Sequence, residues 1–118
     1  MFTVGVVIEL VDRWTGEPVD DNSDPVCIEE GKQQTFECRV RPVSRNDWRI
    51  LWILDDYIVR NGTVVKTPIH KGLVQLASRY TVSNGAGTAL PNSLACKVTG
   101  PNELILNAEV LLYCSGKK

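Results

Sequence analysis

Four widely spaced cysteines constrain the fold of this chain more than any other feature of its sequence. They are Cys27, Cys38, Cys96 and Cys114; no two of them form a Cys-x-x-Cys pair, and His70 is the single histidine. A zinc site usually needs close ligand pairs, so that one turn presents two donors to the ion, and no metal site is therefore expected. An even number of cysteines in a short chain favours two disulfides, with three connectivities open. Four buried free thiols in a cytosolic protein are the alternative.

The composition is that of one ordinary globular domain. The chain has 118 residues, of which 43% are apolar and 23% charged, enough for one core and too few for two. A net charge of −1 argues against nucleic acid as a partner, because dedicated nucleic-acid binders carry a basic surface. The longest apolar stretch, residues 4–8, is far shorter than the roughly 20 residues of a membrane-spanning helix. No basic segment precedes it, so neither a membrane span nor a secretion signal is expected in this sequence.

Short apolar runs separated by turn residues predict an all-β chain. Strands are expected at residues 3–11, 35–40, 50–54, 80–83, 94–99 and 104–113. Turn residues lie between them, including the pairs at residues 55–56 and 61–62. No segment carries a capped helical period, although residues 73–76 could form one short helical turn. Short strands without intervening helices favour an antiparallel two-sheet sandwich.

Period-two alternation assigns the faces of the expected strands. Phe36 and Cys38 alternate with Glu37 and Arg39, so the apolar pair is expected to face the core. The residues expected inside by the same alternation are Phe36, Cys38, Val40, Ile50, Trp52, Leu54, Leu94, Cys96 and Val98.

Trp52 follows Cys38 by 14 residues, on the next expected strand, and Cys96 follows Cys38 by 58 residues; this order and spacing resemble those of immunoglobulin-superfamily domains of the I-set or V-set type. The resemblance covers residues 25–114. It implies a disulfide between Cys38 and Cys96 that joins the two sheets and packs on Trp52, and a second bridge between Cys27 and Cys114. The family usually has a tyrosine two residues before its second cysteine, where this chain has Leu94. A register that pairs Cys38 with Cys114 is the alternative.

The resemblance divides the chain into two parts of one structural unit. Residues 25–118 form the immunoglobulin-like domain, and residues 1–24 form an N-terminal extension with an extra strand and an acidic loop. An exposed apolar strand edge invites aggregation, so the extra strand is expected to pair, either with this sandwich or with a partner.

Apolar side chains that alternate away from the core predict a surface for another protein or for a second copy of the chain. The residues assigned to this surface are Leu51, Ile53, Leu111 and Tyr113, with Trp48 and Tyr57 near the strand ends. Cover by the N-terminal strand is the alternative reading of the same pattern.

Two further features concern possible ligands. Arg39, Arg41, Arg45 and Arg49 form a basic run that could bind a sulfated glycan, unless the acidic N-terminal segment folds over it. Asn61 begins the single N-x-S/T sequon and is expected in an exposed turn that can carry an N-glycan.

These features together favour a binding module over an enzyme. His70 lies beside Lys71 with no local nucleophile, so no catalytic residue and no cofactor is expected. The expected function is extracellular or cell-surface protein recognition of the adhesion, receptor or immune type. The alternatives are a structural I-set spacer of an intracellular filamentous protein, whose cysteines stay reduced, and a glycan-binding sandwich.

Overall fold

The computed structural model describes residues 6–20, 22–44, 48–70, 72–85, 90–101 and 105–114. In these ranges the chain forms nine β-strands and no α-helix. The strands are β1 (Val7–Asp12), β2 (Pro18–Val19), β3 (Gln33–Ser44), β4 (Arg49–Leu54), β5 (Tyr57–Asn61), β6 (Val65–His70), β7 (Leu73–Ser83), β8 (Ser93–Thr99) and β9 (Ile105–Leu111).

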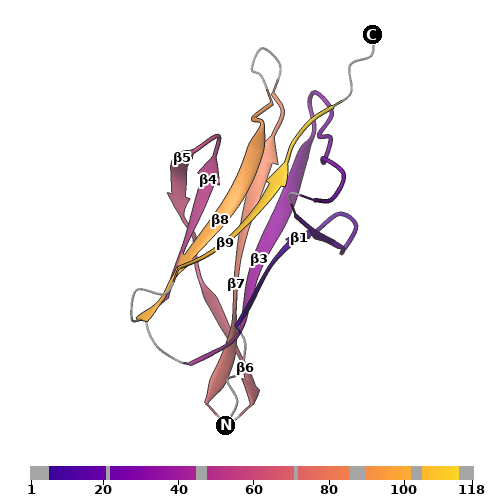
Figure 1. Ribbon diagram of the computed structural model, residues 1–118. Coiled ribbons are helices and arrows are strands. Elements are labelled where there is room, and N and C mark those ends of the chain that lie inside the picture. Colours follow the sequence, from indigo (N-terminus) through magenta and orange to yellow (C-terminus); the bar gives the residue numbers. More distant parts are fainter. Residues whose placement is uncertain are drawn as a thin grey trace.

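The strands form two antiparallel sheets that pack face to face (Figure 1). The five-stranded sheet has the order β2-β1-β3-β7-β6, and the four-stranded sheet has the order β5-β4-β8-β9. The predicted all-β, two-sheet antiparallel sandwich is confirmed.

Both predicted disulfides are present. Cys38 of β3 is bonded to Cys96 of β8, which joins the two sheets through the core. Cys27 is bonded to Cys114, next to a parallel bridge between Val26 and Leu112. The Cys38–Cys114 alternative is therefore wrong, and so is the alternative of four free thiols.

The core is centred on the disulfide that joins the sheets. Three of the side chains expected there, Phe36, Trp52 and Leu94, are each 0% exposed. Trp52 stacks on Tyr80 with ring centroids 5.6 Å apart, and its Nε1 donates a hydrogen bond of 3.0 Å to Ser78 Oγ. The buried indole N–H is thus satisfied within the core, as a tryptophan in this position requires.

The N-terminal strand belongs to this sandwich. β1 pairs antiparallel with β3, with Leu10 opposite Cys38, and with the short β2 on its other side. Leu10 and Val11 are both buried. Of the two alternatives for this strand, pairing within the sandwich is the one observed.

Part of the strand pattern was missed by the sequence analysis. β5, β6 and the first half of β7 were not expected, and residues 73–76, where a helical turn was considered, belong to β7. β5 and β6 are edge strands, so their outer flanks face solvent and they lack the apolar alternation of a half-buried strand. Tertiary pairing, not local propensity, fixes them.

The two expected turns near β5 have different outcomes. Asp55 and Asp56 form the two-residue β4–β5 turn, both with positive φ, as a tight hairpin requires. The turn expected at residues 61–62 is wrong, because Asn61 is the last residue of β5 and residues 62–64, which connect it to β6, form neither a turn nor a strand. A Cβ on Gly62 would meet Ser78 Oγ and Trp52 Nε1, so close packing explains this glycine.

Candidate interaction surface

The outer face of the four-stranded sheet carries an apolar row across three strands. Strand registers place Ile58 of β5 opposite Ile53 of β4, and Ile53 opposite Ala95 of β8. Directly opposed residues in an antiparallel sheet project to the same side, so these three side chains are neighbours. Leu51 precedes Ile53 on the same side of β4, and Leu111 of β9 lies one step diagonally from Ala95.

The five residues Leu51, Ile53, Ile58, Ala95 and Leu111 are called the apolar face below. Ile58 is 64% exposed and Leu111 is 42% exposed, whereas Leu51 and Ile53 are half-buried and Ala95 is buried. Ala95 is the smallest of the five side chains and lies between Ile53 on β4 and Leu111 on β9. The sequence analysis did not assign Ile58 or Ala95 to this surface. Ile58 lies on β5, a strand that was not expected.

Charged residues border the apolar face. Glu109 of β9 is opposite Ala95, Lys97 of β8 is opposite Leu51, and Arg49 of β4 is opposite Thr99. An apolar centre with a polar rim is the composition of a protein–protein interface.

Three expected members of this surface have distinct positions. Tyr113 is 62% exposed and follows Leu111 by two residues, so it extends the apolar face beyond the end of β9. Tyr57 is 76% exposed but alternates with Ile58, which directs it to the other side of β5. Trp48 does not belong to the surface, because it is buried in the hydrophobic core and packs over Gly100.

The N-terminal strand does not cover the apolar face. β1 is hydrogen-bonded within the five-stranded sheet, and its Leu10 belongs to the shared core, with Ile8 packed against it. Among the residues that the structure describes, the alternative of cover by this strand is thus not observed.

The expected arginine run does not form one patch. Arg39 and Arg41 alternate with buried Val40 on β3 and lie on the outer face of the five-stranded sheet. Arg49 lies on the outer face of the opposite sheet, and Arg45 is outside the described residues. Consecutive strands β3 and β4 belong to different sheets, which separates residues that are close in sequence.

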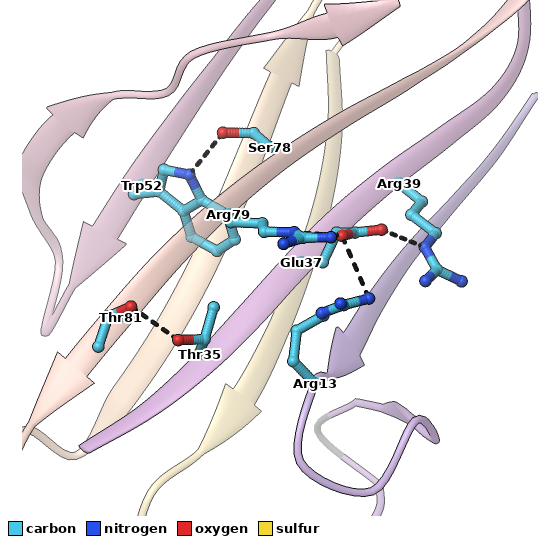
Figure 2. A network of polar contacts seen from close by, with 8 residues as sticks. All are labelled: Arg13, Thr35, Glu37, Arg39, Trp52, Ser78, Arg79 and Thr81. Atoms are coloured by element: carbon cyan, nitrogen blue, oxygen red, sulfur yellow. Dashed lines mark hydrogen bonds and ion pairs between the residues drawn. The ribbon is translucent and has the colours of Figure 1, made fainter. Parts of the chain in front are cut away.

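A different arginine cluster surrounds Glu37 of β3 (Figure 2). The Nε of Arg79, from β7, donates to Glu37 Oε1 at 2.8 Å, and the Nε of Arg39 donates to Oε2. Nη1 of Arg13, which follows β1, lies 3.7 Å from Oε1. The Glu37 side chain is 7% exposed. Burial raises the pKa of this carboxyl, but the hydrogen bonds and charges of Arg39 and Arg79 outweigh burial and hold the pKa below its ordinary value.

Arg13 and Arg79 were missed by the sequence analysis because they are distant from Arg39 in the sequence. The signal available was alternation: Arg79 and Glu37 each lie between inward-facing residues of their strands.

A groove of about 540 Å³ lies at the end of the sandwich that carries the Cys27–Cys114 disulfide. Trp14, 78% exposed, and the buried Asp12 line it. Asp12 Oδ2 accepts a hydrogen bond from Gln34 Nε2, and Oδ1 accepts one from the backbone N–H of Trp14. Both carboxylate oxygens are therefore occupied by the protein itself.

The last expected site residue, Asn61, lies at an edge of the four-stranded sheet. Asn61 is the last residue of β5, and its side chain lies outside the described atoms. In the described ranges, no group of three or more histidine, cysteine, aspartate or glutamate residues is arranged to hold a metal ion. No described helix is long and apolar enough to cross a membrane.

Comparison with known proteins gives no assignment. No protein-family model matches the chain, and a search of the curated proteins gave no significant match.

Proposed function

We propose that this chain is an extracellular immunoglobulin-like binding module that recognises another protein, or a second copy of itself, through the apolar face. The observation that carries the proposal is the row of Ile58, Ile53 and Ala95, with Leu111 beside it, on a sheet surface that β1 leaves uncovered. Contiguous apolar side chains with a charged rim are typical of interaction sites rather than of a solvated sheet face.

The immunoglobulin-like assignment rests on Cys38, Trp52 and Cys96. The disulfide between β3 and β8 packs in the same core as the buried indole, which is the arrangement that the sequence resemblance implies. The sheet containing β4, β8 and β9 is also the face through which members of that family often pair, and this adds an argument by analogy.

The two disulfides support an extracellular or cell-surface location, because disulfides persist in oxidising compartments. An intracellular spacer would keep its four cysteines reduced. Titration of free thiols in protein isolated under alkylating conditions separates the two functions. We expect no reactive thiol, and four thiols per chain would support the spacer.

Sedimentation equilibrium over a range of protein concentrations tests self-recognition. We expect concentration-dependent dimerisation that Ile58→Lys combined with Leu111→Lys weakens at least tenfold, since a lysine would carry its charge into a desolvated interface. Both side chains are substantially exposed, so the melting temperature should change little. Val65→Lys with Ile69→Lys adds the same charge at exposed positions on β6 and is the matched control.

A monomer at all concentrations would rule out the homophilic form of the proposal. Multimerised wild-type protein is then screened against purified cell-surface ectodomains, with the same two double variants. A ligand that binds the wild type and the β6 variant but not the Ile58/Leu111 variant supports recognition of another protein through this face. Equal binding to all three proteins would contradict the site.

A further inference from the structure

On the outer face of the five-stranded sheet, the buried carboxylate of Glu37 lies among three guanidinium groups. Their summed positive charge exceeds the single negative charge of the carboxylate. Glu37 is bonded to Arg39 and Arg79, and Arg13 lies within ion-pair distance. One arginine would neutralise one glutamate. The excess remains at the surface, where the side chains of Arg13 and Arg79 are 40% and 59% exposed.

The other strand residues on this side do not cancel the excess. Arg41 follows Arg39 on the same side of β3, and Glu9 of β1 is opposite Arg39. Among the described strand residues on this side and Arg13, four arginines therefore face two glutamates, Glu37 and Glu9, which leaves an excess of positive charge. Like charges held this close repel one another, and a bound anion would relieve the repulsion.

The geometry leaves donors for such an anion. Arg39 and Arg79 both reach Glu37 through Nε (Figure 2), so these two contacts do not use the terminal nitrogens of either guanidinium. A guanidinium edge binds sulfate or carboxylate oxygens with paired hydrogen bonds. Glu37 fixes the orientation of the planar groups, which reduces the entropy lost when a ligand is bound.

A groove of about 440 Å³ continues from the arginines toward β6. Glu37 and Arg79 line one part of it; its other lining residues are the polar Thr63, Thr67, Gln75 and Ser78 and the apolar Val65 and Ala77. Hydroxyl and amide groups suit the hydroxyls of a sugar chain. The described strand residues on this face include no tryptophan, tyrosine or phenylalanine, so these strands lack the large stacking platform on which single-stranded nucleic acids depend.

We propose that this surface, Arg13, Arg39, Arg41 and Arg79 around Glu37 with the adjoining groove, binds a sulfated glycan. It lies on the opposite side of the sandwich from the apolar face, so it does not rest on the proposed protein-recognition function. Glu37 acts as a positioning residue, and the arginines make the contacts.

Heparin, as a sulfated glycan probe, tests the proposal in an equilibrium binding assay and on an affinity column eluted with salt. Arg39→Gln with Arg79→Gln should weaken heparin affinity about tenfold or more, because two charge-assisted contacts are lost. This variant leaves Glu37 short of partners, so its melting temperature is measured in parallel. Arg13→Gln with Arg41→Gln keeps both short bonds to Glu37, removes the same charge, and should weaken binding comparably.

The matched control is Lys32→Gln with Arg60→Gln, which lowers the net charge equally at two exposed positions that belong neither to the arginine cluster nor to the apolar face. It should bind heparin as the wild type does. Hyaluronan, an unsulfated polyanion, should bind at least tenfold more weakly than heparin. The proposal is overturned if wild-type protein fails to bind heparin in moderate salt, if the control loses as much affinity as the two arginine variants, or if Arg13→Gln with Arg41→Gln has no effect.

Discussion

At the scale of single residues, Trp52 contributes through both volume and hydrogen bonding. Its ring fills the space beside the Cys38–Cys96 disulfide, and its N–H is satisfied only by Ser78. Trp52→Ala should lower the free energy of unfolding by about 3–5 kcal/mol, because it leaves a cavity in the core. Ser78→Ala removes only the acceptor and should cost about 1–3 kcal/mol. Urea unfolding measures both values, and equal losses would show that cavity formation is not the main cost.

Glu37 makes stability depend on pH. Its folded-state pKa lies below the ordinary glutamate value, so the folded protein binds this proton more weakly than the unfolded chain. The resulting stabilisation is complete above the unfolded pKa of about 4.3 and is lost as pH falls toward and through the lower folded pKa. The stability difference between wild type and Glu37→Gln should therefore narrow below about pH 4.3. Parallel stability curves down to acid pH would contradict this assignment.

At the scale of strands, β1 is an integral part of the core rather than an appended segment. Leu10 is 1% exposed opposite Cys38, whereas Val7, on the same strand, is 54% exposed. Leu10→Ala should destabilise the protein by about 2–5 kcal/mol. Val7→Ala should change stability by less than about 0.5 kcal/mol. Thermal and urea unfolding measure the two losses, and a Leu10 effect as small as that of Val7 would mean that β1 detaches without disturbing the core.

Alternation in the sequence predicted the strands that carry Phe36, Trp52 and Leu94, but the first half of β7 was missed although buried residues alternate there with less buried ones. It placed Phe36, Trp52 and Leu94 in the core, and all three are fully buried. It failed for β5 and β6, whose pairing is set by β4 and β7. Gly62 shows the same limit in a single residue. The dipeptide Asn61-Gly62 suggested a turn, whereas glycine is required at position 62 because a larger residue would contact Trp52 and Ser78.

At the scale of the whole molecule, the sequence predicted which side chains face outward. It was less successful in predicting which of these side chains lie next to one another on the surface. Leu51, Ile53 and Leu111 lie on one outer sheet face as expected, because their strands were identified correctly. The arginines were grouped by proximity in sequence, and the sheet order separates Arg49 from Arg39. Cross-strand neighbours such as Arg79 and Glu37 depend on a register that no local pattern specifies.

The two disulfides occupy different environments, which predicts an order of reduction. Cys38 and Cys96 are 0% exposed, whereas Cys27 is exposed and Cys114 is half-buried. Thiol exchange requires access of the attacking thiolate to a sulfur atom. Under native conditions, a mild reductant should therefore open Cys27–Cys114 first, while Cys38–Cys96 stays protected until the sandwich unfolds.

Timed alkylation followed by peptide mass spectrometry measures this order. Loss of the outer bridge, Cys27–Cys114, should leave a folded protein. Its free energy of unfolding should be lower by up to about 4–5 kcal/mol, the chain-entropy value for a loop of this length. Loss of the inner bridge, Cys38–Cys96, should cost a similar entropic amount, and its two thiols, once alkylated, no longer fit the packed core beside Trp52. The outer bridge thus limits the separation of the sheet ends, whereas the inner bridge also fills the core. Simultaneous labelling of all four cysteines from the folded state would contradict this division.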